Sequence, residues 1–169
     1  AWFIDPETCM NPDLQYAQAI KGIVTGRGIG IIDTIHLLEV VRSLIIMEQD
    51  DLLSVDEAVA TKDWFSKYLF WLTDHPYGKE EMEAKNNHET CWVMQAALFA
   101  QYAGNTDVSD FCRERFRNVL LPDQMDTDGS FPLELKRTKP YGYSLFNLDA
   151  MATVCHILSD ENHNLWQYT

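Results

Sequence analysis

Apolar residues recur every three or four positions along most of the chain, which is the spacing of one face of an α-helix. The pattern predicts helices at residues 31–47, 54–73, 79–84, 88–103, 107–120 and 145–158. No stretch alternates apolar and polar residues for long enough to predict a strand. The predicted fold class is therefore all-α.

Residues at the ends of these segments support the boundaries. Ser54-Val55-Asp56-Glu57 matches the S-x-x-E capping box that starts a helix. Gly104 followed by Asn105 is a typical stop signal for the helix at 88–103. Residues 1–30 contain two prolines and four glycines, which favours an extended segment or a short helix followed by a loop. Residues 122–143, rich in Asp, Gly and Pro, predict a second long loop.

The helices differ in how many of their sides are apolar. Residues 31–47 are apolar on most sides, which predicts a helix buried between layers, whereas 107–120 is polar enough for an outer helix. Alternating buried and amphipathic helices with long connections favour the paired inner and outer helices of an (α/α) toroid over a four-helix bundle. The chain has only about six predicted helices, so a toroid built from it would be incomplete. We therefore expect residues 1–169 to be part of one toroid domain, completed by the remaining part of a longer chain.

The chain is acidic, with 26 Asp and Glu against 13 Lys and Arg and a formal net charge of −13. This balance argues against a nucleic-acid-binding protein, which needs a basic surface for the phosphates. A polyanionic substrate requires basic side chains gathered at the binding cleft. The candidates are Arg27, Lys79, Lys85, Arg137 and Lys139. No apolar run approaches the roughly 20 residues of a membrane helix, so no membrane partner is expected.

Neither a metal nor a cofactor is expected. The four cysteines are far apart and form no C-x-x-C pair, so free thiols are favoured over disulfides, and no zinc site is predicted: Cys9, Cys91, Cys112 and Cys155. The loop that begins at Asp126 resembles a calcium loop, but its twelfth position is Arg137, where a bidentate Glu is required. The glycines at 26–30 follow no predicted strand, which argues against dinucleotide binding.

Two short segments contain residues suited to chemistry. Lys85-Asn86-Asn87-His88 lies at the start of a buried helix, where two amides and an imidazole can present donors and a base to one ligand. The alternative is that Asn86 or Asn87 caps the helix and His88 is an ordinary first-turn residue. The second segment brings a guanidinium, an ammonium and two phenols within seven positions: Arg137, Lys139, Tyr141 and Tyr143. A cation beside a phenol stabilises the phenolate, which makes a tyrosine usable as a base.

These segments resemble motifs of the alginate lyase family of polysaccharide lyases, in the chondroitin AC/alginate lyase superfamily. Lys85-Asn86-Asn87-His88 is similar to the Asn-Asn-His motif of that family. Residues 129–137, followed by Tyr143-Ser144-Leu145-Phe146-Asn147-Leu148, are similar to its Arg/Tyr segment. The opening of the chain, through Gly26-Arg27-Gly28-Ile29-Gly30, is most similar to polysaccharide lyase family 38.

The resemblance implies a secreted or periplasmic toroid enzyme that cleaves a β-1,4-linked uronan, such as mannuronate-type alginate or glucuronan, by β-elimination. Asn87 would stabilise the substrate carboxylate as charge develops on it. His88 would lie near C5, as the base or as a second carboxylate partner. Tyr143 would be the general acid, and in a syn elimination also the base. Arg137 would orient Tyr143 and stabilise its phenolate.

Further residues are expected to contact the anionic polysaccharide: Gln18, Arg27, Lys85, Lys139 and Tyr141. For Arg27 a surface salt bridge is the equal alternative, and Tyr141 is close enough in sequence to take the role of Tyr143. Two other functions stay open. One is a non-catalytic uronan-binding toroid; the other is a glycoside hydrolase on the same scaffold, with Asp126 or Asp128 paired with Glu134.

Overall fold

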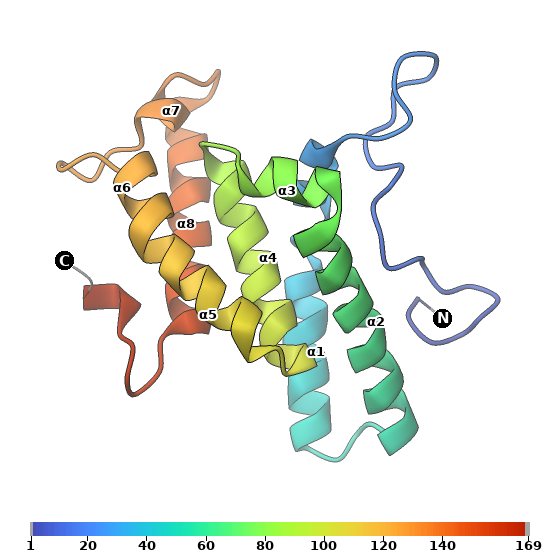
Figure 1. The fold of residues 1–169 in the computed structure, drawn as a ribbon. Helices are drawn as coiled ribbons and strands as arrows, with labels where there is room; N and C mark the ends of the chain where they lie inside the picture. Colours follow the sequence, from blue (N-terminus) through green and yellow to red (C-terminus); the bar gives the residue numbers. More distant parts are fainter. Residues whose placement is uncertain (1, 168–169) are drawn as a thin grey trace.

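Helix α4 (Asn87–Ala103) crosses the middle of the structure, a computed structural model that describes residues 2–167 (Figure 1). It contacts four other long helices, which are α1 (Leu37–Gln49), α2 (Val55–Asp74), α5 (Thr106–Arg115) and α8 (Pro140–Leu158). In Figure 1, α1 and α8 lie on the far side and α2 and α5 on the near side of the molecule. Successive long helices therefore alternate between two layers, and the predicted all-α fold, part of an (α/α) toroid, is confirmed.

Short elements connect the long helices: η1 (Gly28–Thr34), α3 (Pro76–Met82), η2 (Phe116–Leu120), α6 (Leu121–Gln124), α7 (Pro132–Leu135) and η3 (Leu165–Gln167). Two of them correct predicted helices. The helix predicted from residue 31 begins only at Leu37, since residues 28–34 form a 3-10 helix. The Thr34 hydroxyl lies 2.7 Å from both the Tyr68 hydroxyl and Gln95 Oε1, which fixes this segment against α2 and α4. The helix predicted at 107–120 ends as an α-helix at Arg115 and continues as the π-helical turn η2.

The prediction of one loop from residue 122 to 143 is wrong. This stretch contains the end of α6, all of α7 and the first turn of α8. Helix α8 begins at Pro140, because proline at the first helical position loses no hydrogen bond and already has a helical φ angle. Tyr141 and Tyr143 are consequently helical residues, held at fixed positions in the first turn of α8.

The predicted burial is correct for the central helix α4 and for the outer helix α5, whose only buried residue is Cys112, but not for α1. Fourteen of the seventeen residues of α4 are buried, and its Trp92 has no exposed surface. Helix α1 was expected to be buried on most sides, but its Ile46 is 56% exposed. Leu145 and Leu148 of α8 are also exposed. The difference arises because α4 has neighbours on both sides, whereas α1 and α8 lie at the edges of their layer.

The cysteines are free thiols, and all but Cys9 are buried. Burial raises the pKa of both Cys91 and Cys112 to about 12. No described helix combines the length and the apolarity needed to cross a bilayer. Within residues 2–167, no group of histidine, cysteine and carboxylate side chains is arranged to hold a metal ion.

The predicted capping box starts α2 and provides a first test of the fold. Ser54 Oγ accepts a hydrogen bond from the Glu57 backbone amide, and the Glu57 carboxylate accepts one from the Ser54 amide. We expect Ser54→Ala to lower the free energy of unfolding by about 1 kcal/mol, because the Glu57 backbone amide loses its side-chain acceptor. Urea unfolding measures the change. Ser66→Ala, at an exposed site inside the same helix, is the control and should be neutral or slightly stabilising; equal losses in both variants would contradict the capping role.

Candidate functional site

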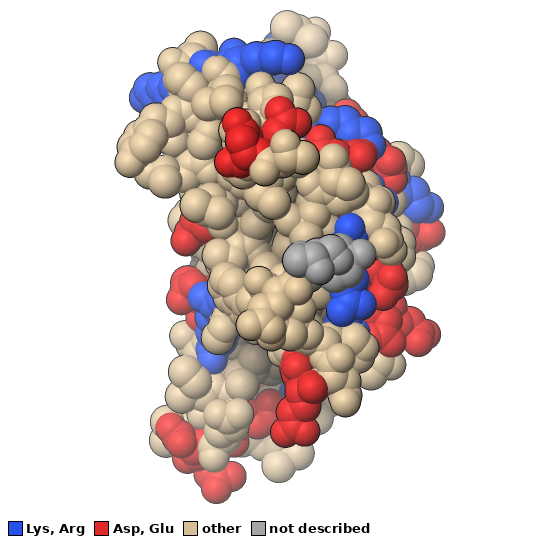
Figure 2. All heavy atoms as spheres, turned by 90° about the vertical axis from the view of Figure 1, so that its left-hand side faces the viewer, with Lys and Arg blue, Asp and Glu red and all other residues tan. Residues whose placement is uncertain are grey.

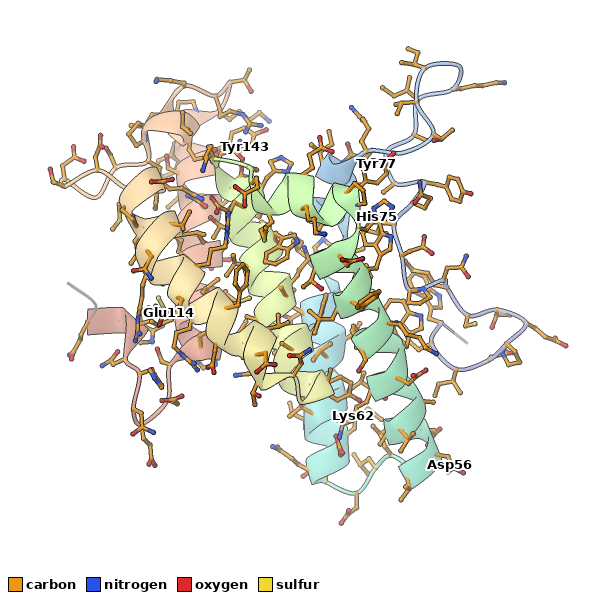
Figure 3. The ribbon with its side chains drawn as sticks, in the orientation of Figure 1. Asp56, Lys62, His75, Tyr77, Glu114 and Tyr143 are labelled. Atoms are coloured by element: carbon orange, nitrogen blue, oxygen red, sulfur yellow. The ribbon has the colours of Figure 1, made fainter. Side chains whose placement is uncertain are left out.

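The two predicted motif segments meet at one end of the molecule, where α3, the N-terminus of α4, α7 and the N-terminus of α8 come together (Figure 1). Figure 3 shows Tyr143 at this end. The connection is direct, since the backbone amide of Asn87 donates a 2.7 Å hydrogen bond to Glu134 Oε1. Glu134 lies on α7, one helical turn before Arg137. A buried carboxylate therefore joins segments that are almost fifty residues apart in sequence.

Arg137 and Tyr143 are in contact through the face of the aromatic ring. The guanidinium carbon lies 4.1 Å from the ring centroid of Tyr143, which is cation–π geometry. Arg137 Nη1 is also 3.9 Å from Glu134 Oε2, a distance that allows an ion pair but is too long for a hydrogen bond. Contacts therefore run without interruption from Asn87 through Glu134 and Arg137 to Tyr143. Tyr143 is half-buried here, whereas Tyr141 is 77% exposed.

Asn86 and Asn87 have different roles at the start of α4. The side chain of Asn86 accepts a hydrogen bond from the backbone amide of His88 and is the helix cap. The side chain of Asn87 is buried, and its Oδ1 has no hydrogen-bond partner among the described residues. Asn86 is therefore the residue that caps the helix. The side-chain amide of Asn87 is not used for capping and is available for another role.

Other buried polar atoms where α4, α7 and α8 meet also lack a hydrogen bond. Among the described residues, Glu134 Oε2, Ser144 Oγ and Asn147 Oδ1 form no hydrogen bond. Asn147 belongs to the same neighbourhood as α4, because its amide donates to Gln124 Oε1, which also accepts from Thr90 of α4. Buried polar groups are almost always paired in folded proteins, since leaving them unpaired costs free energy. Their concentration where α4, α7 and α8 meet marks this region as a candidate binding site.

His88 lines a cavity beside these residues. The cavity has a volume of about 440 Å³ and is lined by Ile29, Glu80, Glu81, Ala84, Lys85, Asn86, His88 and Leu133. His88 Nδ1 lies 2.6 Å from Glu81 Oε1, and the Glu81 side chain is only 2% exposed. Of the other predicted site residues, Lys85 also lines the cavity, whereas Asn87, Arg137 and Tyr143 are not among its lining residues.

The residues predicted to bind the polysaccharide fall into two groups. Arg27 donates hydrogen bonds to the backbone carbonyl and the side-chain oxygen of Gln18, so these two are brought together, and neither partner is a carboxylate. Gln18 in turn donates to the carboxylate of Asp33. Lys139 and Tyr141 are exposed at the start of α8, on the side of the site where Arg137 lies.

The charges around the site are mixed. Figure 2 shows basic side chains along the upper edge of one face and acidic side chains below them. The cavity itself holds Glu80 and Glu81 against Lys85 and His88. Lys85 lies 3.5 Å from Asp123, and Lys79 lies 3.3 Å from Asp74. The expected collection of basic side chains is therefore partly neutralised by neighbouring carboxylates.

A buried ion pair between α5 and the first turn of α4 lies next to the site. Arg115 Nη2 lies 2.7 Å from Glu89 Oε1, and Glu89 has no exposed surface. The same guanidinium donates to the Met82 carbonyl at the end of α3, and Gln124 of α6 donates to the other Glu89 oxygen. Burial raises the pKa of Glu89, and the charge of Arg115 opposes that rise. One ion pair therefore connects the ends of α3 and α6 to the first turn of α4.

Sequence reasoning missed two carboxylates of this site. It considered Glu134 only as a hydrolase residue, although the spacing of one helical turn to Arg137 was a usable signal. It gave no role to Glu81, which meets His88 only because the chain reverses between α3 and α4. Asp128, the other hydrolase candidate, is exposed and accepts the Ser130 amide within its own turn.

Comparison with known proteins gives one family. The sequence model of the alginate lyase family matches residues 1–169. Among solved structures, the chain is similar to an alginate lyase from Bacteroides ovatus, with 34% sequence identity and a TM-score of 0.86. That match covers 96% of this chain and 44% of the other, so this chain spans less than half the length of that protein. No curated protein sequence gives a significant match.

Proposed function

The chain belongs to the alginate lyase family, and on that basis we propose that it forms part of a polysaccharide lyase that cleaves a β-1,4-linked uronan by β-elimination. Mannuronate-type alginate and glucuronan are the leading substrates. In both, the C5 hydrogen and the C4 oxygen lie on the same side of the sugar ring, so one group can serve both atoms. No cofactor is part of the proposal.

The chemical difficulty is removal of the C5 proton, which is acidic only because C5 is next to the carboxylate. We propose that Tyr143, in its phenolate form, removes this proton. The electron pair of the C5–H bond forms the C4–C5 double bond as the bond from C4 to the glycosidic oxygen breaks. Tyr143 then returns the proton to the leaving oxygen, so the enzyme is regenerated without a further reactant.

The carboxylate of the substrate gains negative charge during this step and needs donors placed in advance. The side-chain amide of Asn87 and the imidazole of His88 are the proposed donors. Arg137 lies over the ring of Tyr143 and compensates its negative charge. The observation that carries this assignment is the unbroken line of contacts from Asn87 through Glu134 to Arg137 and Tyr143.

Binding of the polymer extends beyond the reacting sugar. We propose that Lys85, Lys139 and Tyr141 contact neighbouring uronates, and that Arg27, held by Gln18, binds one carboxylate with its remaining donors. A polymer of this size is degraded outside the cytoplasm, so we propose a secreted or periplasmic location. The exposed apolar faces of α1 and α8 fit a further role, contact with the remaining part of the same toroid.

An absorbance assay tests the reaction class. The full-length protein is incubated separately with mannuronan, guluronan, glucuronan and hyaluronan, while ultraviolet absorbance and reducing ends are followed. We expect both signals to rise with mannuronan or glucuronan, because elimination creates a C4–C5 double bond conjugated with the carboxylate. Reducing ends without absorbance would indicate a hydrolase, and binding without either signal would indicate a non-catalytic toroid; each result would overturn the proposal.

A further inference from the structure

Glu81 is a buried carboxylate that the proposed reaction does not use. It lies on the last turn of α3 with only 2% of its side chain exposed, and its Oε1 is 2.6 Å from His88 Nδ1. A carboxylate that is removed from water is costly unless a donor compensates it. The imidazole of His88 is the partner that the structure provides.

From this contact we propose that Glu81 is a positioning residue for His88, fixing the orientation of its ring and the nitrogen that meets the substrate. The inference rests on the proposed function. In this proposal Nδ1 is the donor of the contact, since an ionised carboxylate only accepts hydrogen bonds. Nε2 is then the ring nitrogen left for the uronate. Carboxylates that hold the far nitrogen of a functional histidine set its tautomer in the same way.

The position of Glu81 is itself fixed by packing at both ends of α3. At its start, His75 Nδ1 accepts the backbone amide of Tyr77 and caps the helix. Gly78 lies so close to the end of α2 that a Cβ there would be 2.0 Å from the Leu72 carbonyl oxygen. At the other end, the Met82 carbonyl accepts a 2.7 Å hydrogen bond from Arg115. Helix α3 cannot shift without breaking these contacts, and Glu81 is therefore held rigidly against His88.

The kinetic test uses the full-length protein and Glu81→Gln, which keeps the size of the side chain and removes its charge. We expect kcat to fall between about 10-fold and 100-fold, with KM changed less than about threefold, because the oriented imidazole acts mainly on charge that develops during the reaction. Glu83→Gln, an exposed carboxylate just after the same helix, is the matched control and should keep wild-type kinetics. Wild-type kcat in Glu81→Gln would overturn the inference.

Coupling between the two residues separates positioning from a general loss of structure. If Glu81 acts through His88, then Glu81→Gln should cause no further loss of kcat in a His88→Gln background. Independent, multiplicative losses in the double variant would overturn the inference. Thermal unfolding of each variant shows whether the fold is retained.

A spectroscopic measurement does not depend on activity. Histidine labelled with ¹⁵N reports, through long-range proton–nitrogen correlation, which ring nitrogen carries the proton, and His88→Gln identifies the signal. We expect Nδ1 of His88 to be protonated in the wild-type protein and to lose this preference in Glu81→Gln. An unprotonated Nδ1 in the wild type would overturn the inference even if Glu81→Gln does not fold. If no uronan is cleaved, the proposed function fails, and the tautomer still decides the role of Glu81.

Discussion

Tyr143→Phe should abolish elimination while leaving substrate binding intact. The substitution removes only the hydroxyl, and the ring that packs against the Arg137 guanidinium remains. Because one hydroxyl is proposed to act as both base and acid, we expect kcat to fall by at least about 10³-fold. Initial rates of absorbance increase measure the loss. Calorimetric titration with a uronate oligosaccharide should give a dissociation constant within about threefold of the wild-type value, since uniform binding is unaffected.

Tyr141→Phe is the control for this prediction. Tyr141 is two residues away in the same helical turn, but it is 77% exposed and does not contact the guanidinium in the way Tyr143 does. We expect a loss below about tenfold, mostly in KM, because a peripheral contact contributes to binding and not to proton transfer. If Tyr143→Phe retains turnover and Tyr141→Phe does not, the acid–base role belongs to Tyr141. Activity in both variants would move it to His88.

Arg115→Met should cause a large loss of stability. It removes the positive charge beside Glu89, which has no exposed surface, and so leaves a buried carboxylate without its ionic partner. Breaking one side of a buried ion pair costs about 3–5 kcal/mol. Chemical denaturation at pH 8 measures the change. Arg42→Met, which removes an exposed pair with Glu39, is the control and should cost less than about 1 kcal/mol.

The loss caused by Arg115→Met should also depend on pH, and its sign follows from Glu89. Burial holds the folded-state pKa of Glu89 above its ordinary value, and Arg115 opposes this shift. Without Arg115 the folded-state pKa rises further, so the folded protein binds the proton more tightly than the unfolded chain does. Stability is then present at low pH and is lost as pH rises through the folded-state pKa. The deficit should be smaller at pH 5 than at pH 8, and an equal deficit at both would contradict the assignment.

Helix positions could be predicted from the sequence because burial of one face imposes a period on it. The capping box at Ser54 and the stop at Gly104 are local signals, and both are confirmed, with Gly104 at a φ of 73° that suits glycine. What could not be predicted depends on contacts distant in sequence. The sequence places Arg115 on a polar outer face. In the structure its side chain points into the interior, where it donates a hydrogen bond to Glu89.

The candidate site shows the same division. The segments that contain Asn87, His88, Arg137 and Tyr143 could be found from their residue types, whereas the roles of these residues came from resemblance to a family and stay predictions. That the two motifs adjoin could not be derived from spacing, because it depends on the hydrogen bond between the Asn87 amide and Glu134. The composition of residues 122–143 concealed the short helix α7 and the first turn of α8. Proline usually breaks a helix, but Pro132 and Pro140 each lie in the first turn of one, where proline is tolerated.

The deep burial of α4 has a consequence for how proteins of this kind can diversify. Only three of its residues, His88, Gln101 and Ala103, are not buried, so almost every substitution along it disturbs the interior. Mutational drift toward a new substrate preference has little freedom on this helix. It must accumulate instead at the exposed positions of residues 79–86 and 125–139, near the cavity, and not at Glu81, Glu134 or Arg137 within them.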